Sequence, residues 1–216
     1  MKGATLLIIA FTILTACKKD RITGEGTVVS QSRSVSGFTQ VHTAGSTNVY
    51  ITQGDQFSVE VRGYENLLPY LETKVVDNEL RIGFRKTSSV QNDNTEVRIT
   101  MPVLNGLRAD GSGHMITRGD FSGNAAFTVD ISGSSNIEIE KGSAEHFTGH
   151  ISGSGNIKAF GLSTVQTDIT VDGSGNTEIS VSQKLNATLS GSGNVYYKGN
   201  PTVNARITGS SQVIAQ

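Results

Sequence analysis

The sequence predicts an all-β protein built as a single-chain parallel β-helix, or solenoid, with coils of about 18–22 residues and a β-rich segment flanking its N-terminal end. Three observations support this prediction. A short glycine-containing motif recurs at nearly constant spacing, apolar and polar residues alternate with the same phase in every copy, and every copy has glycine at the same place. Self-similarity at such a period is typical of stacked supersecondary units.

The repeated motif is a seven-residue stretch of the type apolar–Ser–Gly–Ser–Gly–Asn–apolar. Five copies align directly, at 131–137, 151–157, 171–177, 189–195 and 207–213; residues 109–115 join them, and 43–49 is a more distant copy. Steps of 22, 20, 20, 18 and 18 residues separate the first glycines, which are Gly111, Gly133, Gly153, Gly173, Gly191 and Gly209. A spacing of this length fits one coil of a solenoid, with two or three short strands per coil.

Side-chain alternation keeps one phase around this glycine. The positions two, four and six residues before it, and four and six after it, are mostly apolar, as in Phe127, Val129 and Ile131. We expect these side chains to point inward, because successive side chains of a strand point to opposite faces. The outward positions form columns of mixed charge, and two of these are Glu138–Lys158–Glu178 and Arg108–Asp130–His150. Stacked parallel coils would place each column in register, where like charges repel.

The turn itself has a structural interpretation. Glycine permits the positive φ of a sharp corner. A column of amides follows it, formed by Asn136, Asn156, Asn176 and Asn194, which we expect to hydrogen-bond along the solenoid axis. The alternative is a polar edge that binds a glycan or Ca²⁺. Calcium is the weaker option, because the motif lacks the aspartate of calcium-binding nonapeptide repeats, and we predict no metal site.

The N-terminus has the features of a lipoprotein signal. Lys2 precedes an apolar stretch at 6–14, which is too short to span a bilayer as a helix but suits a secretory signal. Residues 14–17, Leu-Thr-Ala-Cys, resemble the bacterial lipobox, so we expect cleavage between Ala16 and Cys17 and lipidation of Cys17. The alternative is an ordinary signal peptide with an incidental cysteine. Cys17 is the only cysteine, so no intramolecular disulfide can form.

We divide the chain accordingly. Residues 1–16 are the signal peptide, 17–34 the lipidated cysteine and a polar tether, and 35–216 the solenoid domain, with regular coils at 105–216. Residues 57–101 do not follow the repeat. Within them 57–61 and 96–100 alternate like strands, and 75–84 reads as a hairpin across Asp77-Asn78-Glu79. We expect this segment to cap the N-terminal end, since an open end exposes strand edges and core.

Several stretches outside the turn motif carry a family resemblance. They are 37–41 (Gly-Phe-Thr-Gln-Val), 49–55 (Val-Tyr-Ile-Thr-Gln-Gly-Asp) and 65–70 (Glu-Asn-Leu-Leu-Pro-Tyr). Together with the Gly-Ser-Gly-Asn series, in order and spacing, they resemble the putative auto-transporter adhesin, head GIN domain family, from about residue 35 to the end. The resemblance implies a β-helix-like fold, export with a lipid anchor in Bacteroidetes-type bacteria, and an adhesin role. It brings no catalytic or binding residues.

Composition and spacing narrow the function. A net charge of −1, without a basic stripe, argues against nucleic acid as a partner. The four histidines lack metal-ligand spacing, and we expect no cofactor. Among the aspartates Asp110, Asp130, Asp168 and Asp172, only Asp130 shares its phase with basic residues, Arg108 and His150. An outer charge ladder explains this grouping without catalysis. We therefore predict that the chain is not an enzyme, and the possibility of a polysaccharide-active enzyme ranks last.

Two functional hypotheses remain. The first is a membrane-anchored adhesin or surface-interaction module of the cell envelope, with a glycan or protein ligand on the solenoid face. We expect its membrane to be the outer one, because Lys18 directly follows the lipidated cysteine; the leaflet is left open. The second is a structural envelope protein that forms homo-oligomers through the ends of the solenoid. The ligand's identity does not follow from these residues.

Overall fold

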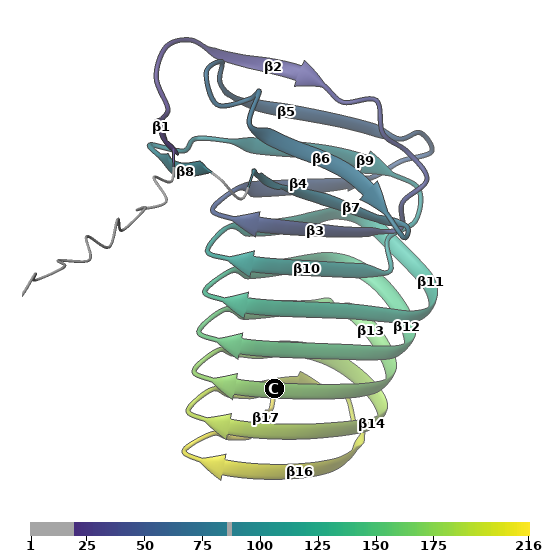
Figure 1. Ribbon diagram of the computed structural model, residues 1–216. Helices are drawn as coiled ribbons and strands as arrows, with labels where there is room; N and C mark the ends of the chain where they lie inside the picture. Colours follow the sequence, from purple (N-terminus) through teal and green to yellow (C-terminus); the bar gives the residue numbers. More distant parts are fainter. Residues whose placement is uncertain (1–19, 86–87) are drawn as a thin grey trace, which may run out of the picture.

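A computed structural model describes residues 20–85 and 88–216. Within these ranges the chain forms seventeen strands and no helix, and its strands stack into a solenoid (Figure 1). The predicted all-β solenoid is therefore confirmed. No helix in the described ranges is long and apolar enough to cross a membrane.

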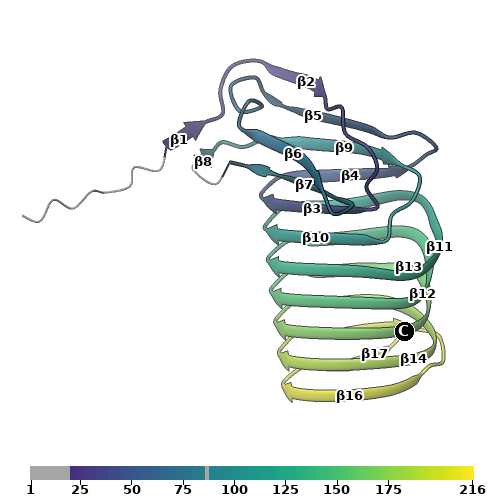
Figure 2. The same cartoon turned by 45° about the vertical axis from the view of Figure 1, so that its right-hand side comes forward.

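The solenoid strands belong to one continuous sheet of fifteen strands, which wraps into two faces. Four long strands bend around one side of the stack and contribute to both faces, as the turned view shows (Figure 2). They are β11 (His114–Gly133), β12 (Asn136–Gly153), β13 (Asn156–Gly173) and β14 (Thr177–Gly191). Each ends at the next Gly-Ser turn. The coil therefore has one wide bend and one sharp corner.

We name the two faces by their first solenoid strands. The β3 face contains β3 (Gln40–Gly45), β10 (Gly106–Gly111), the second halves of β11 to β14, and β16 (Thr202–Gly209). The β4 face contains β4 (Asn48–Gln53), the first halves of β11 to β14, β15 (Val195–Lys198) and β17 (Val213–Ala215). All these neighbours pair in parallel.

The register follows the sequence repeat. The first glycine of each turn pairs with the first glycine of the next coil, from Gly45 on Gly111 to Gly191 on Gly209. The distant copy at 43–49 thus forms the turn between β3 and β4, which stack on β10 and β11. Its β3 strand lies directly on β10, although residues 46–105 separate the two in sequence.

The core runs along the inside of the stack. The inward positions of the central coils are buried, with Phe127, Phe147 and Leu185 at no more than 1% exposure. A large apolar side chain buried in this way stabilises the fold by roughly 1.5–3 kcal/mol. The last coil differs: Ile207 occupies the same inward position as Leu189 but is 43% exposed, whereas Leu189 is 1% exposed. The reason is that no described coil packs on its outer side.

The β-rich segment at the N-terminal end extends both faces beyond the first coil. On the β3 face, β7 (Glu79–Phe84) pairs in parallel with β3, and β6 (Leu71–Val76) adds an antiparallel strand. The β6–β7 hairpin turns at Asp77 and Asn78, whose φ angles are 52° and 64°. Two positive φ values are what a two-residue type I′ hairpin requires, so the predicted hairpin is confirmed.

The same segment extends the β4 face with three strands. Here β9 (Glu96–Met101) pairs in parallel with β4, β5 (Ser58–Tyr64) pairs antiparallel with β9, and β2 (Val28–Ser32) forms the edge. A separate two-stranded ribbon joins β1 (Asp20–Thr23) to β8 (Ser88–Gln91). These strands cover the first coil, as expected of a capping segment (Figure 1).

Candidate functional site

The glycine corner places the sequence-selected glycines in a conformation that L side chains rarely adopt. Their φ angles are +140° at Gly111, +114° at Gly133, +127° at Gly153, +136° at Gly173, +124° at Gly191 and +106° at Gly209. A Cβ added at Gly173 would also collide with the carbonyl oxygen of Gly153 in the preceding coil. Two independent constraints thus select glycine here, and both are structural.

The asparagine column is hydrogen-bonded along the axis, but in two ways. Asn156 Nδ2 donates to Asn136 Oδ1 at 2.7 Å, and Asn176 Nδ2 donates to Asn156 Oδ1 at 3.3 Å. Further down, backbone N–H groups donate to the amide oxygens: Asn194 N donates to Asn176 Oδ1 at 3.0 Å, and Gln212 N donates to Asn194 Oδ1 at 2.9 Å. These amides satisfy each other and the turn backbone, so their geometry serves the fold.

The predicted lipidation site lies elsewhere. Cys17 and the cleavage point between Ala16 and Cys17 fall outside the described residues. The lipid anchor stays a prediction from the sequence.

On the β3 face, the charged columns are in register but pair differently from a simple ladder. Arg108 lies beside Asp130 across the strands, yet its Nε contacts Asp110 Oδ2 at 3.3 Å. His42 Nε2 lies 2.8 Å from the same carboxylate oxygen. Asp110 is thus held between His42 and Arg108. No group of three or more metal-ligating side chains occurs in the described part of the chain.

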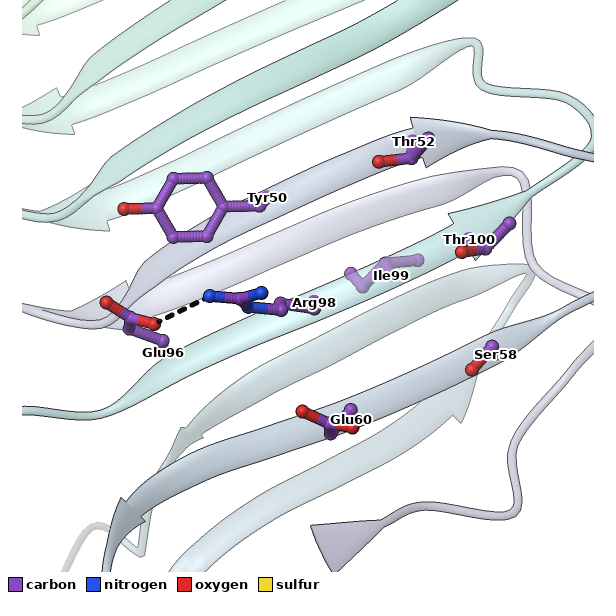
Figure 3. A pocket seen from close by; sticks show the side chains of 8 residues that line it. All are labelled: Tyr50, Thr52, Ser58, Glu60, Glu96, Arg98, Ile99 and Thr100. Atoms are coloured by element: carbon purple, nitrogen blue, oxygen red, sulfur yellow. Dashed lines mark ion pairs between the residues drawn. The ribbon is translucent and has the colours of Figure 1, made fainter. Parts of the chain in front are cut away.

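The β4 face contains a hollow of about 510 Å³ where β4, β9 and β5 meet (Figure 3). This volume lies within the range of roughly 300–1,000 Å³ typical of small-molecule sites. The hollow is shallow and open rather than enclosed. It is lined by Tyr50, Thr52, Ser58, Glu60, Glu96, Arg98, Ile99 and Thr100.

Strand pairing explains how these side chains come together. Arg98 is the cross-strand neighbour of Tyr50 on one side and of Glu60 on the other. Their side chains therefore project from the same face of three adjacent strands. Tyr50 lies between Arg98 and Ile116 of β11, and its ring is drawn along the surface of the sheet in Figure 3.

The charges of the hollow form a small network. Arg98 Nη2 lies 3.5 Å from Glu96 Oε2, and Arg62 Nη1 approaches the same oxygen at 3.9 Å. Glu60 Oε1 accepts a hydrogen bond from Ser30 Oγ at 3.1 Å. The Arg98 side chain is nevertheless 62% exposed, so its guanidinium stays available to a ligand. The arrangement offers hydrogen-bond donors and acceptors beside an aromatic ring.

The sequence pattern does not predict this site. Alternation around Val49 and Ile51 places Tyr50 on an outward face, which is a usable signal. The residues that complete the site come from β5 and β9, which do not follow the repeat. β9 is distant in sequence, and β5 runs antiparallel to it. Nothing in the repeat indicates that pairing.

The family relationship is settled by a match over most of the chain. The model of a family described as "putative auto-transporter adhesin, head GIN domain" matches residues 37–201. The chain belongs to this family. The resemblance seen in the sequence is thereby confirmed. No match was found among curated proteins.

Solved structures share the fold of this head GIN domain chain. A putative adhesin from Bacteroides fragilis is 22% identical, with 90% of this chain and 100% of that chain covered, at a TM-score of 0.68. A putative adhesin from Parabacteroides distasonis is 26% identical, with 91% of this chain and 100% of that chain covered, at a TM-score of 0.56. A putative lipid binding protein from the same species is 21% identical, with 91% of this chain and 100% of that chain covered, at a TM-score of 0.64.

Proposed function

We propose that this head GIN domain protein is an exported adhesin-like binding module, held at the cell envelope and using a lateral face of its solenoid to bind a ligand. The observation that carries this proposal is the open hollow on the β4 face. Its charged and aromatic side chains do not fill the core, and Arg98 is mostly exposed. Exposed polar side chains gathered on a rigid scaffold favour recognition over packing.

The family supports the same role. Its description is that of an adhesin, and two solved structures with this fold are described as putative adhesins. An adhesin acts at the cell surface or in the envelope, which agrees with the secretory signal at the start of the sequence. The partner we propose is a glycan or a protein, and no nucleic acid.

Binding without catalysis is the form we favour. On the β3 face, Asp168 Oδ2 contacts His146 Nε2 at 2.9 Å, and Asp168 Oδ1 accepts from Asn186 Nδ2 at 2.6 Å. Asp110 is likewise engaged by His42 and Arg108. Acids that are held by their neighbours in this way support a structural ladder rather than a pair of catalytic carboxylates at a cleft.

The membrane attachment in this proposal is a lipid on Cys17, in the outer membrane. The sequence predicted a polar tether over residues 17–34, but β1 and β2 lie within that stretch and pair with β8 and β5, so the folded body already includes them. Several acyl chains on one residue would anchor the chain far more firmly than one. Cells grown with a labelled palmitate analogue should label the natural chain, and Cys17→Ser should abolish the label and release the protein from the membrane fraction. Membrane retention of an unlabelled Cys17→Ser chain would contradict the anchor.

Adhesion is tested with cells that display the full chain. Compared with cells lacking it, they should adhere better to surfaces coated with glycans or extracellular-matrix proteins. Equal adhesion on every coating would overturn the proposed function.

A second candidate, self-association through the end of the solenoid, is favoured by the last coil. β16 is an edge strand with Ile207 exposed at an inward position, and unpaired strand edges are templates for further pairing. Light scattering over a wide concentration range tests this candidate. A mass that stays monomeric at high concentration would exclude it.

A further inference from the structure

We propose that the hollow formed by β4, β9 and β5 is a subsite for one pyranose unit of a neutral glycan, with the sugar lying on the Tyr50 ring and its hydroxyls bound by Arg98 and Glu60. This inference rests on the proposed binding function and specifies its ligand class and its site. It is based on the aromatic surface, the charge balance and the exposure of the residues around the hollow.

The ring of Tyr50 is the first part of the proposed subsite. Tyr50 is half-buried, and its ring lies along the sheet rather than projecting from it (Figure 3). A ring in this orientation offers a flat apolar surface, with the hydroxyl as a polar handle at one end. The apolar C–H face of a pyranose is complementary to such a surface. Phe160, another outward aromatic of the β4 face, is different, because the Lys198 ammonium lies 4.4 Å from its ring centroid and occupies that surface.

The charge balance argues for a neutral ligand. Two acids, Glu60 and Glu96, face two bases, Arg62 and Arg98, across the paired strands. The formal charges cancel, so neither an anionic sugar nor a cationic ligand gains a net electrostatic attraction here. A neutral polyol does not need such attraction.

The hydrogen-bonding groups of Arg98 and Glu60 together match a pair of neighbouring sugar hydroxyls. Arginine only donates and an ionised carboxylate only accepts, whereas each sugar hydroxyl does both. A pair of adjacent hydroxyls can therefore accept from the Arg98 guanidinium and donate to the Glu60 carboxylate. Hydrogen bonds to charged groups are stronger than neutral ones, which favours these two side chains as the main polar contacts. The exposed hydroxyls of Thr52 and Ser58 line the other end of the hollow.

The openness of the hollow predicts weak binding by a single copy. A shallow site buries little of its ligand, so we expect dissociation constants on the order of 1 mM for one site, which corresponds to roughly 4 kcal/mol. Many copies on one membrane raise the effective concentration of sites, and adhesion then becomes strong without any new contact. A lipid-anchored chain would present its copies in this manner.

The test begins with the full-length chain, purified from membranes in detergent and applied to an array of neutral, sialylated and sulfated glycans. We expect signals on neutral oligosaccharides. The best of these is then titrated in solution, with affinities measured from the tyrosine ring resonances in NMR spectra. Selective binding of sialylated or sulfated glycans would overturn the neutral-sugar assignment.

Variants locate the site. Tyr50→Ala and Arg98→Ala should each weaken binding at least about tenfold, whereas Tyr50→Phe keeps the ring face and should stay within about threefold of the natural chain. The matched control is Tyr196→Ala. Tyr196 occupies the equivalent outward position on β15 of the same face, away from the Arg98 network, and its loss should leave binding unchanged. Because Arg98 is mostly exposed, its variant is expected to fold, which thermal unfolding will verify.

The outcomes separate this subsite from the broader function. If neutral glycans bind equally well to Tyr50→Ala and Arg98→Ala, the subsite is wrong while the adhesin-like function stands. If no glycan binds but displaying cells still adhere to matrix proteins, the sugar chemistry is wrong and the function again stands. If neither glycans nor matrix surfaces are bound, both proposals fail.

Discussion

At the residue scale, the first glycine of each turn is fixed by a local and a non-local constraint. Its positive φ is a property of the corner, and its lack of a Cβ makes room for the carbonyl of the coil before it. The first constraint can be read from a Gly-Ser turn in the sequence. The second exists only because coils stack in register, so it follows from the repeat as a whole.

A substitution at this glycine measures both constraints. We expect Gly173→Ala to lower the free energy of unfolding by about 1–3 kcal/mol, since strained φ values and close backbone contacts each have a cost of this order. The control is Ser174→Ala, at the exposed next residue of the same turn. Urea denaturation of both variants provides the measurement. Equal stability of the two would mean that the corner relaxes without cost.

Another residue-scale prediction concerns the exposed pair Asp120 and Lys141. Lys141 Nζ lies 2.7 Å from Asp120 Oδ2, and hydrogen bonds from Lys141 and then Ser122 lower the pKa of Asp120 below its ordinary 3.8. Any stabilisation from this pair is therefore complete above the ordinary pKa and is lost as the pH falls through the lowered one. Lys141→Met should return the pKa of the Asp120 carboxyl toward 3.8 in an NMR titration. A pKa that does not move would show that Lys141 is not the cause.

At the scale of the element, the asparagine column links consecutive coils. Asn156 is an inner member of the column, donating to Asn136 and accepting from both the backbone N–H and the side chain of Asn176. Removing its amide leaves the backbone donor of Asn176 without this partner. A polar group deprived of its hydrogen bond typically costs about 1–3 kcal/mol.

Asn156→Ala should therefore destabilise the solenoid by about 1–2 kcal/mol, in the lower part of that range because the site is only half-buried. Ser154→Ala, an exposed position of the same turn, is the control and should change little. Hydrogen exchange at the amide of Asn176 should accelerate in the first variant alone. Unchanged exchange would indicate that the column adds no stability there.

Elements differ in how far the sequence predicts them. The β6–β7 hairpin follows from two residues, Asp77 and Asn78, that tolerate positive φ between alternating stretches. The regular coils follow from their repeat. In contrast, the alignment of β5 beside β9 depends on contacts between strands separated by about one-sixth of the chain, and alternation gives the face of a residue but not its neighbour. Tyr50 could therefore be placed outward, while its grouping with Arg98 and Glu60 could not be predicted.

At the scale of the whole molecule, stability comes from stacking, because each coil buries its inward residues against the next. The cap strands supply this cover at the N-terminal end. At the other end of the described stack, the apolar positions of β16 have a neighbour on one side only, β14. This asymmetry predicts that equivalent residues differ in their contributions to stability.

The comparison of Leu189 and Ile207 tests that asymmetry, since both occupy the inward position two residues before the turn glycine but are 1% and 43% exposed. Leu189→Ala should cost about 2–5 kcal/mol, the usual range for a buried leucine that leaves a cavity. Ile207→Ala should cost less than about 1 kcal/mol in a monomer, because partly exposed positions lose little on truncation. Urea denaturation at two protein concentrations distinguishes a free last coil from one that is covered by a second copy. A large, concentration-dependent cost at Ile207 would mean that a second copy covers β16 in solution, and would favour assembly through the ends over a free lateral module.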